Sequence, residues 1–285
     1  MNVFIFRKVR DFGTVISHSI DLIKSEYRRL GKALLIYVLP FFIITGILLV
    51  LVQISMTKNM AESVRPGMNF FQVYAWKKAG LSYLLQILNF TVLGTVIYSF
   101  LNIYIRKKAE FDVAELKGSL PKLGIKLLFI NLAIVVIVLI ASAFLLIPGI
   151  YLAVIFSLVA PVVVFEDAGF GQALHRSFEI IKGSWWKTFG ILFVGAVIVY
   201  LFSIILSLPL IITTFVKTFH AVSNHSPAQI YTTGYIIAST VVSIIQTFIW
   251  SLVIIFISVQ YFSLIEEKER PTLQEKIDRI NEEQA

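Results

Sequence analysis

The sequence predicts an all-α, polytopic membrane protein: a bundle of about six transmembrane helices with two cytosolic amphipathic helices at the membrane surface. Three observations predict it: long apolar stretches with charged residues only at their borders, few charged residues overall, and an asymmetry of Lys and Arg between alternate connections. Hydrophobic residues make up 58% of the 285 residues and charged residues 15%, against about 25% in an ordinary globular domain. A separate soluble domain with its own core is therefore not expected.

The apolar stretches are long enough to cross a bilayer, since a hydrocarbon core about 30 Å thick needs about 20 apolar residues in a helix. None carries Asp or Glu in its middle, and Lys126 lies near the end of one. The expected spans are residues 33–54, 81–105, 123–147, 150–165, 188–212 and 231–265. Proline followed by glycine marks a turn, so Pro148 and Gly149 are expected to join the third and fourth spans. Pro161 is expected to kink the fourth span.

The distribution of Lys and Arg predicts the orientation of the chain. Twenty of the 25 Lys and Arg residues precede the first span or lie in the second-to-third connection, the fourth-to-fifth connection or the tail. Cytoplasmic loops carry this excess in membrane proteins, so both termini are expected in the cytoplasm. The resulting division is a cytosolic segment at 1–32, a membrane domain at 33–265 and a charged cytosolic tail at 266–285. The net charge of +8 therefore needs no nucleic acid as a partner.

Two segments outside the spans, at 12–30 and 170–184, have the three- to four-residue apolar spacing of amphipathic helices. In the first, the expected apolar stripe is Phe12, Ile16, Ile20, Ile23, Tyr27 and Leu30. A basic amphipathic helix lies in the headgroup layer with its basic face towards anionic lipid. Membrane lipids with anionic headgroups are therefore the expected partners, beside a membrane protein partner or a second copy of the chain.

The basic residues of these two helices are the candidate contacts for lipid headgroups. They are Lys24, Arg28, Arg29, Arg176, Lys182 and Lys187. Trp185 and Trp186 are interpreted as interfacial anchors, because tryptophan rings favour headgroup depth.

The two amphipathic helices align at an offset of 158 residues, which places Ser19 on Ser177 and Lys24 on Lys182. Each helix leads into an outward-going span, a connection and a returning span. This pattern indicates a parallel internal repeat, in which spans one and two match spans five and six. The alternative is that any two cytosolic amphipathic helices look alike.

Ionisable residues inside a membrane mark proton relays and ion pathways, and this chain has very few. Glu166 and Asp167 stand at the cytosolic end of the fourth span. They either cap the following helix or pair with Arg176, or they form a gate or cation site, with Glu166 and Arg176 as the candidate pair. The chain has no cysteine, nucleophile elbow, zinc-binding helix or phosphate loop. An enzymatic function, a metal site and a cofactor are therefore not expected.

The segment from 147 to 187 resembles a known family. The residues that carry the resemblance are Ile147-Pro148-Gly149-Ile150-Tyr151-Leu152, Ala160-Pro161-Val162-Val163-Val164-Phe165-Glu166-Asp167, Ala173-Leu174-His175-Arg176-Ser177 and Lys182-Gly183-Ser184-Trp185-Trp186. The pattern is similar to the membrane domain of bacterial glycerophosphoryl diester phosphodiesterases and to related uncharacterised six-span proteins. The resemblance implies a multi-pass protein of the bacterial cytoplasmic (inner) membrane. In fused members the chemistry belongs to a soluble domain that this sequence does not contain, so phosphodiesterase activity is not carried over.

Two functions follow as hypotheses. The first is a non-enzymatic integral membrane protein that engages anionic lipid or scaffolds membrane partners, which the basic helices favour. The alternative is a transporter or permease for an amphipathic or lipid-like solute, which the repeat favours. Uncharged polar residues inside the spans, such as Asn89, Asn131 and Gln246, either bond between helices or line a polar cavity. Their accessibility to water from alternating sides would distinguish transport from a packed core.

Overall fold

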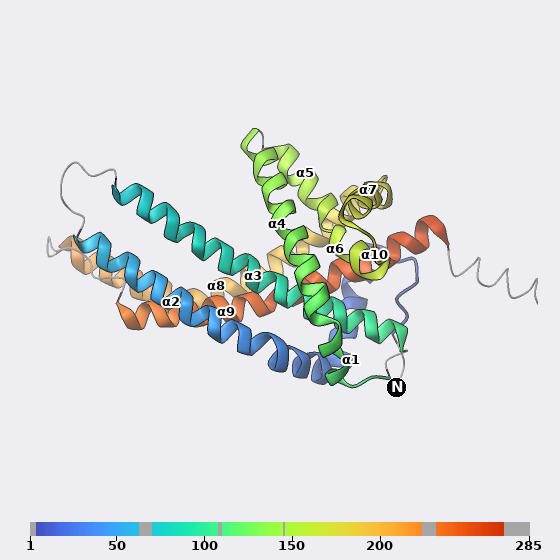
Figure 1. Ribbon diagram of the computed structural model, residues 1–285, viewed down its shortest axis with the longest axis horizontal. Helices are drawn as coiled ribbons and strands as arrows, with labels where there is room; N and C mark the ends of the chain where they lie inside the picture. The colour runs from blue at the N-terminus through green and yellow to red at the C-terminus, as the bar shows by residue number, and fades with distance from the viewer. Residues whose placement is uncertain (1–3, 63–69, 108–109, 145, 224–231, 271–285) are drawn as a thin grey trace, which may run out of the picture. The chain divides into compact units, whose positions relative to one another are not determined.

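The computed structural model describes residues 4–62, 70–107, 110–144, 146–223 and 232–270 (Figure 1). Within these ranges all regular secondary structure is helical, which confirms the predicted all-α class. Six stretches are long and apolar enough to cross a membrane: Phe12–Ser55, Ala79–Arg106, Leu120–Ala143, Ile147–Phe165, Trp185–His220 and Thr233–Glu269. The protein is therefore a multi-pass membrane protein.

The described helices follow one another with short connections. In chain order they are α1 (Phe12–Ala33), η1 (Leu34–Val38), α2 (Leu39–Glu62), α3 (Phe70–Arg106), η2 (Val113–Gly118), α4 (Leu120–Phe144), α5 (Leu146–Phe156), α6 (Val159–Phe165), α7 (Phe170–Ile181), α8 (Trp185–Ser223), α9 (Thr233–Ile249) and α10 (Ser251–Glu269). They form two compact units. Unit 1 contains residues 1–34, 94–196 and 251–285, and unit 2 contains 35–93 and 197–250. Helices α3 and α8 each run from one unit into the other.

Helix α1 begins at Asp11, whose side chain accepts a hydrogen bond from the Thr14 N–H at 2.8 Å. This N-cap satisfies a backbone donor that has no partner inside the helix. The predicted helix at 12–30 is thus present, but it does not end before the first span. Pro40 has no N–H to bond to the carbonyl of Ile36, and the chain passes through the π-helical turn η1 at this point.

Hydrogen bonds from Thr14, and to a lesser extent the charge of Lys187, hold the pKa of Asp11 below its usual value of 3.8. A depressed carboxyl pKa contributes stability above the unfolded pKa, and that contribution is lost as pH falls through the folded pKa. We expect the amide protons of Thr14 and Val15 to lose protection from hydrogen exchange below about pH 4. Asp11→Asn should remove this pH dependence while keeping a cap. Asp21→Asn, the control at an exposed carboxyl within α1, should behave as wild type; an unchanged profile in Asp11→Asn would contradict the assignment.

The face of α1 that packs against the protein differs from the predicted apolar stripe. The buried residues are Val15, Ser19, Leu22, Glu26, Leu30 and Ala33. Of the predicted stripe only Leu30 is buried, whereas Phe12 and Tyr27 are 40% and 57% exposed. The prediction of which face is buried was therefore wrong, because the apolar stripe is wider than the protein contact. Its remaining apolar side chains face outwards.

Helices α4 and α5 form a tight antiparallel hairpin in unit 1 (Figure 1). The prediction of a turn at Pro148 and Gly149 was wrong, because both lie in the first turn of α5. Proline is tolerated there, since the first N–H groups of a helix have no intrahelical partner. Gly149 instead permits close packing: a Cβ at this position would lie 2.0 Å from Ser142 Oγ.

The fourth span is interrupted at Ser157 and Leu158, between α5 and α6. Pro161 lies in the first turn of α6 and cannot donate to the carbonyl four residues earlier, which belongs to Ser157. The expected disturbance of the span by Pro161 is therefore present as a break.

The sixth predicted span, 231–265, was expected to be one helix, but it consists of α9 and α10 with Trp250 between them. The Trp250 N–H bonds to the carbonyl of Thr247, three residues earlier, so the helical ladder tightens at this point. The predicted tail also begins in a helix, because α10 extends to Glu269. The rest of the tail, residues 271–285, lies outside the described residues.

In unit 2, α2 packs closely against α9. A Cβ on Gly46 would lie 2.8 Å from Ile244 Cδ1, and the rings of Phe42 and Phe248 are 4.9 Å apart. Thr45 Oγ donates to Asn89 Oδ1 at 2.7 Å and thereby joins α2 to α3.

In unit 1, α10 forms the core, and its residues from Val253 to Leu264 are all buried. Gly195 allows α8 to approach, since a Cβ there would lie 3.1 Å from Val253. The amide of Gln260 donates to Thr188 Oγ1 at 3.2 Å, which adds a polar tie between the two helices.

An N-terminal segment, residues 4–10, packs on the end of this core. Phe6 is buried against Tyr104 and Phe262. Arg10 is 3% exposed, and its N–H donates to Ser263 Oγ at 2.9 Å. Its guanidinium donates to the carbonyls of Ile5, Phe6 and Lys8 and to His18 Nδ1. Burial lowers the pKa of Arg10, and the carbonyl oxygens satisfy the N–H groups that water would otherwise bind.

The amphipathic helices α1 and α7 bury equivalent positions at the predicted offset of 158 residues. The equivalent pairs are Val15 and Ala173, Ser19 and Ser177, and Leu22 and Ile180. Both serine hydroxyls donate to the carbonyl four residues earlier, at 2.6 and 2.7 Å. This agreement in burial and hydrogen bonding favours a real repeat over a chance likeness.

The spans that follow these helices repeat a polar contact. Ser203 follows Thr45 by 158 residues, and Gln246 follows Asn89 by 157. The amide of Gln246 donates to the Ser203 carbonyl at 3.2 Å and to Ser207 Oγ at 2.9 Å. A side-chain amide on the returning helix therefore meets a hydroxyl-bearing residue on the outgoing helix in both halves, which again favours the repeat.

Candidate functional site

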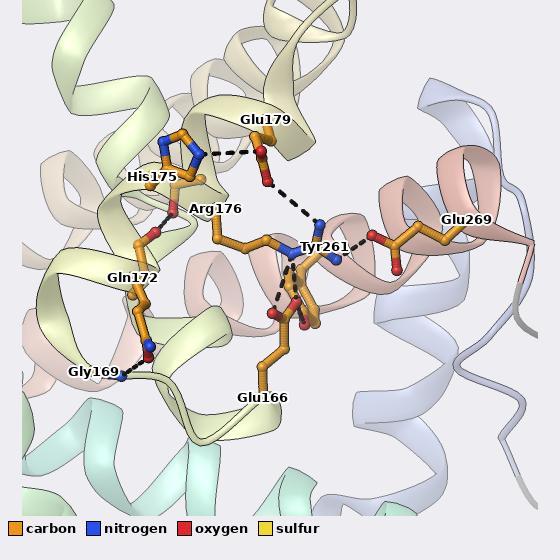
Figure 2. Close-up of polar contacts among 10 residues, drawn as sticks. Glu166, Gly169, Gln172, His175, Arg176, Glu179, Tyr261 and Glu269 are labelled. Carbon is orange, nitrogen blue, oxygen red and sulfur yellow. Dashed lines mark hydrogen bonds and ion pairs between the residues drawn. The ribbon is translucent and has the colours of Figure 1, made fainter.

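The polar residues singled out by the sequence gather around α7. Its first turn is fixed by Gln172, whose Oε1 accepts from the Gly169 N–H at 3.2 Å (Figure 2). After α7 the chain turns at Gly183, where φ is +81°, a conformation that glycine adopts without strain. Helix α8 then begins directly at Trp185. The short turns on both sides fix the direction of α7 relative to α6 and α8.

Arg176 lies at the centre of this cluster (Figure 2). Its Nε donates to Glu166 Oε2 and Oε1 at 3.2 and 3.3 Å, and its Nη1 lies 3.7 Å from Glu179 Oε2. Its Nη2 donates to Glu269 on α10. Tyr261, also on α10, donates its hydroxyl to Glu166 Oε1 at 2.8 Å. The structure therefore brings Glu166 and Arg176 together and adds Tyr261 and Glu269 from the last helix. We call these five residues the Arg176 cluster.

The Arg176 cluster lies at the edge of the protein, because the Arg176 and Glu166 side chains are 27% and 29% exposed. Burial alone would lower the pKa of Arg176, but the hydrogen bond to Glu269 and the charge of Glu166 outweigh it and raise the pKa. Arg176 is thus a permanent cation surrounded by three carboxylates. This arrangement ties α7 to α6 and α10, and the cation already occupies the space between the acidic groups.

The end of α10 makes further polar contacts with neighbouring segments. Lys268 Nζ donates to the carbonyls of Glu179 and Lys182 at 2.6 and 2.7 Å. Such an ammonium satisfies carbonyls that α7 leaves free at its C-terminus. Glu267 lies 3.2 Å from Lys187 Nζ on α8. The charged residues expected to leave the membrane as a tail therefore bind back onto α7 and α8.

The candidate headgroup contacts fall into two groups. Arg29, Arg176 and Lys187 each lie beside a carboxylate of the protein; the Arg29 Nε is 2.9 Å from Glu26. Lys24, Arg28 and Lys182 are exposed. Only this second group presents its charge outwards, so it contains the stronger candidates for contact with a lipid headgroup.

Helix α1 carries an exposed apolar face beside exposed basic residues. Phe12 and Tyr27 are exposed, and the guanidinium of Arg28 lies over the Tyr27 ring at 5.5 Å. By helical geometry, this apolar face lies between the buried face of α1 and Lys24. An apolar face flanked by basic residues is typical of a helix at a membrane interface.

The two predicted anchors differ in their surroundings. Trp186 is 77% exposed, as expected for a ring at headgroup depth. Trp185 stacks on Tyr151 of α5 at 5.6 Å between ring centroids, and its Nε1 donates to the Tyr151 carbonyl at 3.3 Å. Trp185 therefore connects α8 to the α4–α5 hairpin.

Residues of the spans that were candidates for a polar cavity have partners in the structure. Asn89 bonds to Thr45 and Gln246 to α8, as described above, and Asn131 is not free either. These contacts agree with interhelical bonding. Within the described residues, no group of three His, Cys, Asp or Glu side chains is arranged to hold a metal ion.

Three residues of the polar surface were missed from the sequence. Glu269 and Tyr261 lie about ninety residues from Arg176 along the chain, and no local spacing connects them. Glu26 is 5% exposed and pairs with Arg29. Its spacing of four from Leu22 and Leu30 could have indicated that Glu26 shares their buried face.

Comparison with known proteins gives one finding. A family model described as "Domain of unknown function (DUF7847)" matches residues 81–265. No curated protein and no solved structure matches the chain. The matched region contains Glu166, Arg176, Glu179 and Tyr261, whereas α1 and Glu269 lie outside it.

Proposed function

The chain belongs to the family of DUF7847 domains, and from this premise we propose that it is a non-enzymatic integral membrane protein that binds anionic lipid through its basic amphipathic helices. The observation that carries the proposal is the exposed apolar face of α1 beside Lys24 and Arg28. Apolar burial and electrostatic attraction together hold such a helix in the headgroup layer of an anionic membrane.

The contacts between distant segments support a common side for the basic regions. Arg10, before α1, bonds to Ser263 near the end of α10, and Lys187 at the start of α8 pairs with Glu267. Segments in direct contact lie at the same depth of the membrane. The distribution of Lys and Arg favours the cytoplasm for that side, where the surface carries anionic lipid.

The finer identity of the protein remains a proposal. The likeness of residues 147–187 to the membrane domain of glycerophosphoryl diester phosphodiesterases supports a bacterial cytoplasmic membrane as its location. Scaffolding of a membrane protein partner is compatible with the same architecture. In that case the lipid contacts would position the protein for its partner.

The proposal predicts that removing two exposed charges from α1 weakens lipid retention. Each Lys or Arg near an anionic surface contributes about 1 kcal/mol, so Lys24→Gln with Arg28→Gln should cost about 2 kcal/mol. This corresponds to a roughly 30-fold weaker affinity for phosphatidylglycerol at low salt. Native mass spectrometry of protein titrated with this lipid in mild detergent measures the effect.

The matched control is Lys117→Gln with Lys122→Gln, which removes the same charge from exposed positions outside the amphipathic helices. The control should keep the wild-type affinity, and neither variant should change the retention of phosphatidylcholine. Equal losses in both variants would show that net charge matters rather than α1, and no loss in either would refute binding by α1.

A transport function is the second candidate, and the repeat favours it. Transporters are often built from repeated halves, with the substrate site between them. The equivalent burial of α1 and α7 and the paired amide contacts support such a repeat. However, the amides at Asn89 and Gln246 are already bonded to neighbouring helices. We therefore place lipid binding first.

A further inference from the structure

An apolar groove lies in unit 1 between the start of α5 and the start of α8. Its volume is about 460 Å³, and its lining residues are Ile147, Ile150, Tyr151, Trp185, Trp186 and Phe189. This volume lies within the usual range for small-molecule sites. The rim is open to the surroundings of the protein, since Ile147 and Trp186 are 80% and 77% exposed.

One wall of the groove is held in place by aromatic stacking. The Trp185 ring stacks on Phe189 at 5.2 Å with an interplanar angle of 6°, and on Tyr151 at 5.6 Å with an angle of 22°. The bond from Trp185 Nε1 to the Tyr151 carbonyl fixes the ring further. Trp186 stands at 88° to Trp185 and forms a side of the groove. A wall ordered in advance lowers the entropy cost of binding.

The lining and the surroundings define the chemistry of the occupant. All six lining side chains are aliphatic or aromatic. The groove opens on a protein whose helices lie in a bilayer, and the apolar molecules available there are lipid chains. The exposed ring of Phe193 continues the aromatic row along α8, with its centroid 6.0 Å from that of Phe189. This direction leads from the first turn of α8 towards the hydrocarbon core.

The end of the groove at the start of α8 is electropositive. The first N–H groups of a helix have no intrahelical partner, and the helix dipole adds positive charge there. Lys182 is exposed and precedes Trp185 by three residues, in the turn that contains Gly183. The charge therefore lies at the end where the headgroup of a lipid inserted along α8 would be.

We propose that this groove binds one acyl chain of an anionic glycerophospholipid, with the phosphate at the start of α8 beside Lys182. The inference rests on the proposed lipid-binding function and assigns to it a second, saturable site away from α1. The hairpin α4–α5 contributes Ile147, Ile150 and Tyr151, so its position beside α8 completes the site.

Quenching of tryptophan fluorescence by brominated acyl chains tests the site. The chain has four tryptophans, and Trp76→Phe with Trp250→Phe leaves only the two of the groove. This protein is reconstituted in phosphatidylcholine vesicles that contain either dibromo-phosphatidylglycerol or dibromo-phosphatidylcholine. We expect quenching by the anionic lipid to saturate at an approximately fivefold lower mole fraction, and Lys182→Gln to abolish this preference.

A matched pair of substitutions locates the chain within the groove. Ile150→Phe narrows the groove and should remove the saturable component, whereas Ile205→Phe makes the same change at an exposed site on α8 and should leave it intact. Unchanged elution in size-exclusion chromatography and unchanged circular dichroism would establish that both variants fold. Identical quenching curves for the two lipids, or a saturable component that persists in Ile150→Phe, would overturn the proposal.

The α1 variant separates this inference from the proposed function. Lys24→Gln with Arg28→Gln, introduced into the same background, should leave saturable quenching unchanged, because neither residue lines the groove. Saturable quenching in a protein whose lipid retention is insensitive to these changes would uphold the groove and refute binding by α1. Sensitive retention without saturable quenching would refute the groove alone.

Discussion

Replacing Gly149 with alanine is expected to lower the free energy of unfolding by about 1–3 kcal/mol, the usual cost of an overpacked interior. The new Cβ would lie 2.0 Å from Ser142 Oγ, 2.9 Å from Ser142 Cβ and 3.0 Å from Ser142 Cα. The last of these is a backbone atom, so rotation of the serine side chain alone cannot make room. The α4–α5 hairpin would have to open, and the midpoint of thermal unfolding in detergent should fall.

A rescue and a control define this result. Gly149→Ala combined with Ser142→Gly removes the two shortest contacts and should recover most of the lost stability. Gly171→Ala places a methyl group on α7 where no atom lies within 4 Å. That change should be neutral or stabilising, since alanine favours a helix over glycine. Equal stability of Gly149→Ala and Gly171→Ala would show that the hairpin is looser than the structure indicates.

Replacing Arg176 with glutamine is expected to destabilise the protein by about 1–3 kcal/mol, the range for hydrogen bonds to charged groups. The change leaves Glu166, Glu179 and Glu269 close together without the cation between them. Repulsion among the carboxylates should separate α7 from the end of α10. Faster hydrogen exchange in α7 and in the last turn of α10, with unchanged exchange in α9, would report this separation.

A double-mutant cycle isolates the central ion pair. Glu166→Gln removes one carboxylate, so its combination with Arg176→Gln should cost less than the sum of the two single changes. Arg106→Gln removes a cation from an exposed position at the end of α3 and serves as the control. Additive effects of the two cluster variants would contradict a direct Glu166–Arg176 interaction, and a loss in Arg106→Gln as large as in Arg176→Gln would indicate a general effect of charge.

Features with a strong local pattern could be predicted from the sequence. Apolar stretches of sufficient length gave the six candidate spans, because a bilayer requires a minimum helix length. Three- to four-residue apolar spacing predicted α1 and α7, and Pro161 marked the disturbance of the fourth span. The proximity of Glu166 and Arg176 was also expected, since only a short turn and two helical turns separate them.

Features that depend on tertiary packing could not be predicted in this way. Neither proline nor glycine marks the break at Trp250, so only the packing of α9 and α10 into different units reveals it. Pro148 and Gly149 fit a turn and a helix start equally well, and the close approach of Ser142 distinguishes them. Likewise, the partners of Arg176 on α10 depend on how the last helix returns to α7.

The hydrogen bonds between Arg10 and Ser263 have a consequence for biosynthesis, since the two residues are 253 positions apart. Membrane helices are inserted as the chain emerges from the ribosome, and distant contacts wait for the later partner. The polar groups of residues 4–10 must therefore remain hydrated at the membrane surface while nearly all of the chain is made. Synthesis of α10 then allows this segment to dock on Phe262 and Ser263, so the first residues to emerge are among the last to reach their final positions.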